Sequence, residues 1–464
     1  MSGRKPLTTR VGVISLGCAK NLVDTEVMLG HLERAGCSLV HDPEEADVII
    51  VNTCGFIGPA RQESIDTILD VAEHKKDGRL KRLVVAGCMV QRYAGELRES
   101  LPEVDAFIGL DELHKVTDVV AGAASWAVRA ESAVVESPSP TGSATLSPSM
   151  LLYDHTVPRR RATPPWTGYL KIAEGCDHTC SFCAIPGFRG RFRSRTIESL
   201  VAEARAMAAG GVAELNLIAQ DSSHYGRDHG DFDGLANLLV ELDRIEELHW
   251  IRVHYLYPNT VTDRMIAAMA GLPKVVPYVD MPLQHAHPEV LKRMRRGGSA
   301  DSHLRLLERF RAAMPQAALR TTLIVGFPGE TAEEFATLES FVREAGFDHL
   351  GVFTYSHEDG TSAAELADDV PEEVKAERRD RLMELQQEIA LDHLEAKVGE
   401  TVEVLVEGTH PDTDLLLVGR MATQAIEVDG QVLINEGSAR PGLFLSVELT
   451  EVAGYDLVGR IVGD

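Results

Sequence analysis

The residues best suited to chemistry are three cysteines in one short loop. Cys176, Cys180 and Cys183 have the spacing C-x-x-x-C-x-x-C and follow the apolar run 169–173. Thiolates on a compact loop can hold one face of an iron–sulfur cube, which four cysteines normally complete. Because this loop supplies only three, one iron would keep an open position for another molecule. An open metal position is typical of a reactive site rather than a structural one.

A structural zinc site is the alternative interpretation of this loop. Structural zinc takes four tetrahedral ligands, usually in paired C-x₂₋₄-C units, and His178 would have to be the fourth. Since His178 lies between the first two cysteines, its ligation would strain the loop. A disulfide is disfavoured in a chain with cytosolic features. We therefore predict an iron–sulfur cluster.

Three further cysteines share one topological position earlier in the chain. Cys18, Cys54 and Cys88 each follow an apolar strand pattern, and helical patterns near 22–35 and 59–74 separate the strands. The carboxyl ends of parallel strands share one edge, where open α/β folds bind ligands. We expect these cysteines to converge as a second triplet, again without a fourth ligand. Cys37 follows a helix-to-strand turn and is interpreted as a packing residue.

Composition narrows the class of protein. The 464 residues suffice for about three domains, and the formal net charge is -25 at pH 7. So acidic a chain would repel nucleic-acid phosphates and suits a basic partner. The sequence shows neither a signal-peptide pattern nor an apolar run long enough to span a membrane. We expect a cytoplasmic enzyme without membrane contact.

Hydrophobic periodicity predicts an α/β multidomain fold. Residues 1–130 indicate an N-terminal α/β domain with a parallel sheet, and 131–163 a linker rich in Pro, Ser and Thr. In residues 164–394, six strand patterns alternate with helices, which predicts a partial (β/α)6 barrel with the cluster loop on its C-terminal face. Residues 395–464 carry short strand patterns that predict a small antiparallel β-barrel, at 402–406, 415–418, 425–428, 432–434, 444–449 and 457–461.

Polar residues at the ends of the predicted barrel strands are candidates for contact with a cofactor or substrate. We select Phe182, Gln220 and Glu330 as cofactor-binding candidates, although Glu330 and the threonine after it would also suit a helix start. His285 and His287 are interpreted as loop residues rather than metal ligands. The sequence offers no clear carboxylate pair for acid–base work, so no catalytic side chain is assigned.

Arginines are unusually dense near the cluster loop for so acidic a chain. Positive charge beside an anionic thiolate cluster would favour its reduction, and a surface with scattered ion pairs is the alternative. A second basic group, residues 159–161, is either a solvated tether or a contact with a partner. The arginines near the loop are Arg189, Arg191, Arg193, Arg195, Arg293, Arg295 and Arg296.

Together these motifs resemble the radical S-adenosylmethionine (SAM) methylthiotransferases over nearly the whole chain. The segments SLGCAKNLVDTE, VNTCGFI and VAGCMVQRY are similar to that family's auxiliary-cluster domain, and the tail resembles a TRAM domain. Within the family, LIAQDSSHYG, GRMATQAIEVDG and DLVGRIV are closest to the RimO branch. That branch modifies an aspartate of the small-subunit ribosomal protein S-twelve, whereas the other main branch modifies adenosines in transfer RNA.

The resemblance implies two 4Fe–4S clusters and SAM as cofactors. Cys176, Cys180 and Cys183 would ligate a cluster whose open iron chelates SAM. One electron from a separate donor would then yield a 5′-deoxyadenosyl radical that removes hydrogen from the β-carbon of the target aspartate. The other triplet would ligate the cluster that presents the sulfur, and a second SAM would supply the methyl group.

The charge of the tail is an independent observation on the substrate. Residues 395 to 464 carry 13 acidic and four basic side chains. A tail that binds transfer RNA should be basic, so we expect little nucleic-acid affinity and a partner in protein S-twelve or the small subunit. The alternatives are a transfer-RNA adenosine methylthiotransferase and, from another class, a non-enzymatic iron–sulfur electron carrier or ribosome-assembly factor.

Overall fold

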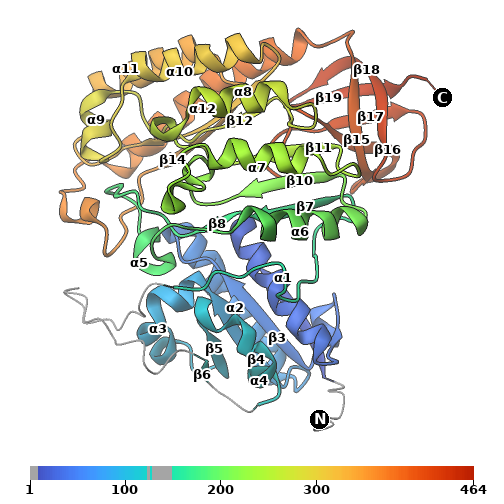
Figure 1. Ribbon diagram of the computed structural model, residues 1–464. Helices are drawn as coiled ribbons and strands as arrows, with labels where there is room; N and C mark the ends of the chain where they lie inside the picture. Colours follow the sequence, from blue (N-terminus) through green and yellow to red (C-terminus); the bar gives the residue numbers. More distant parts are fainter. Residues whose placement is uncertain (1–8, 123–125, 128–148, 464) are drawn as a thin grey trace.

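The computed structural model describes residues 9–122, 126–127 and 149–463. Figure 1 shows a blue N-terminal α/β domain below a central domain coloured green to orange, with a red β-barrel beside the central domain. The predicted α/β multidomain fold is confirmed. Most of the predicted linker, including the Pro- and Ser-rich stretch that begins at Ser137, lies outside the described residues.

The N-terminal domain is built on a six-stranded parallel sheet. The strands run in the order β2-β1-β3-β4-β5-β6, and every residue of β3 is buried, as expected for a parallel strand covered on both faces. The strands are β1 (Arg10–Ser15), β2 (Ser38–Leu39), β3 (Val48–Thr53), β4 (Arg82–Gly87), β5 (Ala106–Ile108) and β6 (Trp126–Ala127). The helices are α1 (Ala19–Arg34), α2 (Gly58–Lys76), α3 (Cys88–Ser100) and α4 (Val116–Val120).

The central domain is an open barrel of six parallel strands in chain order. Two three-stranded sheets, β11-β10-β7 and β12-β13-β14, are joined by a parallel bridge between Ile251 and Val275. The strands are β7 (Thr167–Lys171), β10 (Glu214–Ile218), β11 (Trp250–Val253), β12 (Tyr278–Asp280), β13 (Ala318–Val325) and β14 (His349–Thr354). The helices are α5 (Ile185–Arg189), α6 (Ile197–Ala209), α7 (Gly234–Asp243), α8 (Asp263–Gly271), α9 (Pro288–Arg293), α10 (Ala300–Ala313) and α11 (Ala332–Ala345).

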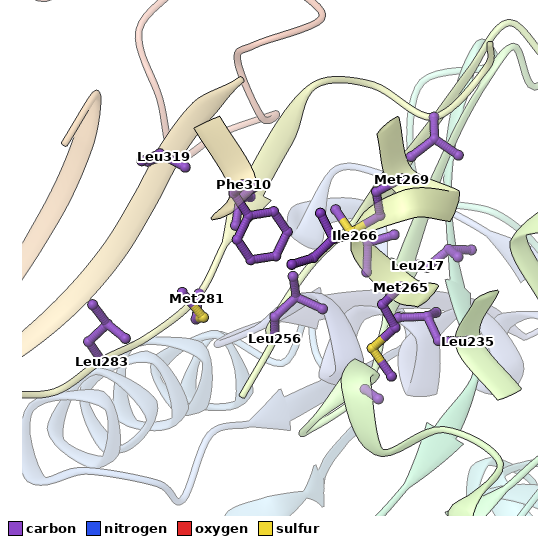
Figure 2. Packing of buried hydrophobic residues seen from close by; sticks show 14 of the residues in the cluster. Leu217, Leu235, Leu256, Met265, Ile266, Met269, Met281, Leu283, Phe310 and Leu319 are labelled. Atoms are coloured by element: carbon purple, nitrogen blue, oxygen red, sulfur yellow. The ribbon is translucent and has the colours of Figure 1, made fainter. Parts of the chain in front are cut away.

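An apolar layer between these helices and strands holds the barrel together. Figure 2 shows part of it, with Leu256, Ile266 and Phe310 among the gathered side chains, all at most 5 % exposed. Burial of this kind stabilises by about 25 cal/mol per Å² of apolar surface. The layer fixes the strand ends, and hence the loops that follow them.

The C-terminal domain is a closed five-stranded barrel that follows a long helix, α12 (Glu372–Glu395). Its strand order is β15-β16-β17-β19-β18. The strands are β15 (Thr401–His410), β16 (Thr413–Met421), β17 (Val432–Glu436), β18 (Phe444–Ala453) and β19 (Asp456–Ile461). The expected purely antiparallel arrangement is wrong in one pair: β19, after pairing with β18, returns alongside β17 in the parallel sense.

The predicted strand at 425–428 is also wrong. Ala425 packs with Trp250 and Tyr278 of the central domain, and Ile426 packs with Tyr169 and other apolar residues near the barrel strands. The apolar residues that suggested a strand therefore dock one domain on another. No helix in the described parts of the chain is long and apolar enough to cross a membrane.

A buried ion network joins the C-terminal barrel to the central domain. Glu214, at the start of β10, lies 3.1 Å from Arg252 and 2.6 Å from Arg420. Arg420 also pairs with Glu407 at 2.9 Å. The Glu214 carboxylate is wholly buried, so its charge depends on these two guanidinium groups.

Loss of the Glu214 carboxylate should loosen the C-terminal barrel. We expect Glu214→Ala to cost about 3–5 kcal/mol, because the buried Arg252 loses its counter-charge and the buried Arg420 keeps only Glu407. Denaturant unfolding followed by tryptophan fluorescence would report it, since Trp250 contacts Phe444 of the barrel edge-to-face. The exposed Glu403 provides the control: Glu403→Ala should change stability by less than about 0.5 kcal/mol. Equal stability of both variants would contradict the role of the network.

The basic group at 159–161 connects the first two domains. Arg159 pairs with Glu26 of α1 and Glu203 of α6, and its side chain is largely buried. For Arg159 the interpretation as a solvated tether is therefore wrong, because its guanidinium forms ion pairs within the chain.

Candidate active site

The two cysteine triplets lie on either side of the boundary between the N-terminal and central domains. Lys20, two residues after Cys18, places its Nζ 3.6 Å from the ring centroid of Tyr255, which follows β11. Arg189, six residues after Cys183, donates to the Sγ of Cys88 at 2.9 Å. The carboxyl ends of both sets of strands therefore meet at this boundary, where Figure 1 places α5 and β8 (Ala173–Glu174) above α1 and α3.

The structure brings Cys18, Cys54 and Cys88 together as the strand pattern predicts. They follow β1, β3 and β4, which are neighbours in the sheet. A Cβ on Gly17 would lie 2.8 Å from the Cβ of Cys54, so the chain before Cys18 packs directly on Cys54. Burial raises the pKa of the Cys88 thiol to about 12, and the nearby Cys18 and Cys54 add to the rise. The three cysteines therefore gather at neighbouring strand ends, as a shared ligand set requires.

Cys37 is not part of this group. It packs in a separate apolar layer with Val11, Met28 and Leu32. This placement agrees with its interpretation as a packing residue.

The loop that carries Cys176, Cys180 and Cys183 is held at both ends. β8 pairs antiparallel with β9 (Arg193–Ser194), and the backbone N–H of Cys176 donates to the carbonyl of Gly190 at 3.0 Å. Gly175 has φ +80°, and a Cβ there would collide with the carbonyl of Arg191. Only glycine allows this close approach, so the loop geometry is set before any metal binds.

The spacing of the thiols fits a four-iron cluster better than a single zinc ion. Within the described parts of the chain, the sulfur atoms of neither triplet all lie within 4.8 Å of one another. A tetrahedral zinc ion with Zn–S bonds of about 2.3 Å would draw them closer than that. In a cluster each thiolate binds a different iron, so the sulfurs lie further apart. All seven cysteines are free, which leaves every thiol available as a ligand.

His178 is occupied by contacts other than the thiols. Its Nε2 lies 2.6 Å from Asp221, and its ring stacks on Tyr257 at 3.7 Å. Asp221 also accepts hydrogen bonds from the Ser223 hydroxyl and the backbone N–H of His224. These contacts brace the cluster loop against the loop after β10 and disfavour zinc ligation by His178.

Burial disfavours the thiolate form of two cysteines in the loop, Cys176 and Cys183. Burial raises the pKa of both Cys176 and Cys183 to about 12. Because iron is bound by thiolates, loading of the cluster must release these protons.

Two of the predicted arginines contact the cysteine triplets, and others form ion pairs. Arg296 lies 3.6 Å from the Sγ of Cys180 and stacks over Tyr257, while Arg189 contacts Cys88. Positive charge at these thiolates favours the reduced form of a bound cluster. Arg195 pairs with Glu203 instead, as the alternative interpretation expects. Arg293 likewise pairs with Glu334.

A buried charge network that sequence reasoning missed supports Arg189. Lys171 pairs with Asp24 of α1 at 2.6 Å and with Glu174 at 2.7 Å. Arg189 pairs with the same two carboxylates, both at 3.0 Å. The network crosses the domain boundary and is balanced in charge. The available signal was Lys171, a charged residue inside an otherwise apolar strand pattern.

The three cofactor candidates occupy different positions. Gln220 donates to Glu174 at 2.9 Å, and its buried Oε1 has no hydrogen-bond partner among the described residues, so it could accept from a cofactor. Phe182 is partly buried against an apolar group that includes Phe327. Contact of these side chains with SAM stays a prediction.

The Glu330 carboxylate forms hydrogen bonds with the backbone of its own loop. Its carboxylate accepts from the backbone N–H of Gly326 at 2.8 Å and of Phe327 at 3.2 Å, and it pairs with Arg378. Burial raises its pKa to about 6, although Arg378 opposes the rise. The adjacent Thr331 caps α11, which agrees with the helix-start alternative. A direct cofactor contact by Glu330 also stays a prediction.

The histidines before α9 behave as loop residues. His285 is wholly buried and accepts from the backbone N–H of His287, whose own ring caps α9 through the N–H of Glu289. Neither belongs to a gathered group of metal-binding side chains within the described residues.

Comparison with known proteins agrees with this geometry. Residues 10–109 match the uncharacterized protein family UPF0004, residues 170–342 the radical SAM superfamily, and residues 398–462 the TRAM domain. The chain is 49% identical over 456 residues to the ribosomal protein uS12 methylthiotransferase RimO of Anaeromyxobacter sp. (strain K), covering 98% of this chain and 94% of that protein. The protein of that name from Geobacter sulfurreducens is 46% identical, with 98% of each chain covered.

The chain belongs to the RimO family. Its fold is also similar to the radical SAM methyltransferase TsrM from Kitasatospora setae, solved with cobalamin and a 4Fe–4S cluster bound. The TM-score is 0.55 at 16% identity, with 89% of this chain and 81% of that chain covered, which supports the fold alone. The RimO family and the radical SAM domain imply SAM and 4Fe–4S clusters as cofactors, as the sequence predicts.

Proposed function

We propose that this chain is a radical SAM methylthiotransferase that adds sulfur and a methyl group at the β-carbon of an aspartate in ribosomal protein uS12, the protein called S-twelve above. The observation that best supports this function is that two cysteine triplets face the same boundary between two domains. The chain's identity to proteins named uS12 methylthiotransferase RimO, over nearly its full length, supports the choice of reaction and substrate.

Each triplet would hold one 4Fe–4S cluster. Cys176, Cys180 and Cys183 would bind the cluster that receives SAM, and the N-terminal triplet, Cys18, Cys54 and Cys88, the auxiliary one. When bound, these groups supply a 5′-deoxyadenosyl radical, the sulfur and the methyl group.

The protein's own contribution is position, charge and exclusion of water. The β8–β9 pair and Gly175 fix the loop of the SAM cluster, and Arg296 places positive charge at Cys180. Arg189 does the same at Cys88, and its ion pairs tie that position to both domains. The buried network around it keeps water from the boundary between the domains, where a reactive radical must be protected.

A transfer-RNA substrate is the nearest rival, and the C-terminal barrel argues against it. Exposed acidic residues of this barrel would repel phosphates. They include Glu400, Glu403, Asp412, Asp414, Glu436 and Glu451.

Binding assays would separate the two substrates. We expect isolated uS12 to bind, and bulk transfer RNA to bind weakly with little dependence on salt, because few phosphates would be neutralised. Methylthiolation of transfer RNA, with uS12 left unchanged, would overturn the proposal. An electron donor and a cytoplasmic location belong to the same proposal.

A non-enzymatic electron carrier is the rival from another class. Anaerobic analysis should give about eight irons per chain for two four-iron clusters, together with SAM cleavage. About four irons without cleavage would support a carrier instead.

A further inference from the structure

Lys20 is a buried lysine without a carboxylate partner among the described residues. Its side chain lies between the N-terminal triplet and the central barrel, and the residue is only 9 % exposed. The Nζ approaches the carbonyl of Ala219 at 3.4 Å and the face of the Tyr255 ring at 3.6 Å. It forms no ion pair with any carboxylate in the described parts of the chain.

Several other buried cations near the domain boundary have carboxylate partners. Lys171 and Arg189 share Asp24 and Glu174. Arg320 of β13 pairs with Asp280 at 3.3 Å and with a second aspartate of the C-terminal domain. A buried charge without a carboxylate partner is costly, so the site of Lys20 favours the binding of an anionic group.

The surrounding structure holds the Lys20 side chain in a defined position. Tyr255, which carries the ring beneath Nζ, has φ +61°, a left-handed conformation that a bulky residue rarely adopts. Such strain persists only where the surrounding structure imposes it, and it concentrates at functional sites. The ring and the Ala219 carbonyl hold the ammonium at the carboxyl ends of β10 and β11, beside Cys18. This is the space in which the substrate must meet both clusters.

We propose that Lys20 binds the side-chain carboxylate of the target aspartate and so selects an acidic residue for modification. The inference rests on the proposed function and adds to it the residue that recognises the substrate. The reacting β-carbon is bonded directly to the carboxyl carbon, so a cation that holds the carboxylate also fixes the carbon from which hydrogen is removed. A charge-assisted hydrogen bond in a water-poor site supplies both affinity and orientation.

The test combines one enzyme substitution with one substrate substitution. Anaerobically reconstituted holoenzyme is titrated with isolated uS12 and with a uS12 variant in which asparagine replaces the target aspartate. Asparagine keeps the size of the side chain but removes its charge. Wild type should bind the aspartate form about 10- to 100-fold more tightly than the asparagine form. Lys20→Met should bind both forms with the same, weaker affinity, and Lys20→Arg should restore part of the preference.

A control variant and a spectroscopic measurement test whether the effect is specific to Lys20. Lys81→Met, an exposed position on the far side of the N-terminal domain, is the matched control and should keep the wild-type preference. The electron paramagnetic resonance spectrum of each variant reports whether the clusters are intact. A Lys20→Met protein with intact clusters and an undiminished preference for aspartate would overturn the inference. So would an altered auxiliary-cluster spectrum with unchanged preference, because Lys20 would then be the cluster's counter-charge.

Failure of the proposed function would look different. In that case wild-type holoenzyme would leave uS12 without a methylthio group, whatever the behaviour of Lys20→Met. If wild type modifies uS12 but binds the aspartate and asparagine forms equally, the proposed function is supported and the proposed role of Lys20 is refuted.

Discussion

Replacing Cys180 with alanine should abolish reductive cleavage of SAM. Cys180 is the middle cysteine of a loop that has no spare thiol: Cys37 packs in a different domain, and His178 is engaged by Asp221. With two thiolates left, the loop cannot hold a four-iron cluster with one open iron. Cleavage is measured as 5′-deoxyadenosine released anaerobically in the presence of a strong reductant, and it should fall to the background without enzyme.

Cys37→Ala is the matched control for this loss. It removes a buried thiol of the same chemistry from an apolar layer and should leave cleavage at the wild-type rate. Persistent cleavage by the Cys180 variant, or by the corresponding variants of Cys176 and Cys183, would refute the assignment of this loop.

Replacing Cys54 with alanine should separate the two halves of the reaction. Cys54 is in the N-terminal triplet, on a different domain from the SAM-cluster loop, so SAM cleavage should continue. Sulfur insertion should stop, and the iron content should fall from about eight to about four per chain. The paired measurements are 5′-deoxyadenosine release and the mass of uS12 after the reaction. Full methylthio product from this variant would remove the auxiliary cluster from the mechanism.

The parts of the fold set by local patterns could be predicted from sequence. α6 and α11 are two of the helices predicted to alternate with the barrel strands, and apolar spacing and a capping threonine at Thr196 and Thr331 define them locally. The convergence of Cys18, Cys54 and Cys88 could also be predicted, since parallel strands put their carboxyl ends on one edge.

What could not be predicted depends on contacts between domains. The segment 425–428 has the composition of a strand, but its apolar side chains dock the C-terminal barrel on the central domain. Asp24 lies on a helix and Lys171 on a strand 147 positions later, so no local pattern could reveal their pairing. Lys20 follows Cys18 closely in sequence, yet its lack of a carboxylate partner in the described parts of the chain is visible only when its neighbours are in place.

The domain boundary explains why the chemistry needs this architecture. Each domain presents three thiols at the carboxyl edge of a parallel sheet, and neither domain alone encloses the space between them. Ion pairs hold the two edges together: Arg159 bridges Glu26 and Glu203, and Arg92 of the N-terminal domain reaches Glu358 beyond β14. Buried charge pairs therefore hold the two domains, and the cysteine triplets that they carry, in a fixed relation to each other.

Mass spectrometry of uS12 tests the central claim most directly. The holoenzyme is incubated anaerobically with uS12, SAM, sulfide and a reductant, and the modified peptide is then fragmented. The account predicts a net gain of one carbon, two hydrogens and one sulfur on a single aspartate, located at its β-carbon. An unmodified uS12 in a reaction that consumes SAM, or a gain located on transfer RNA, would contradict it.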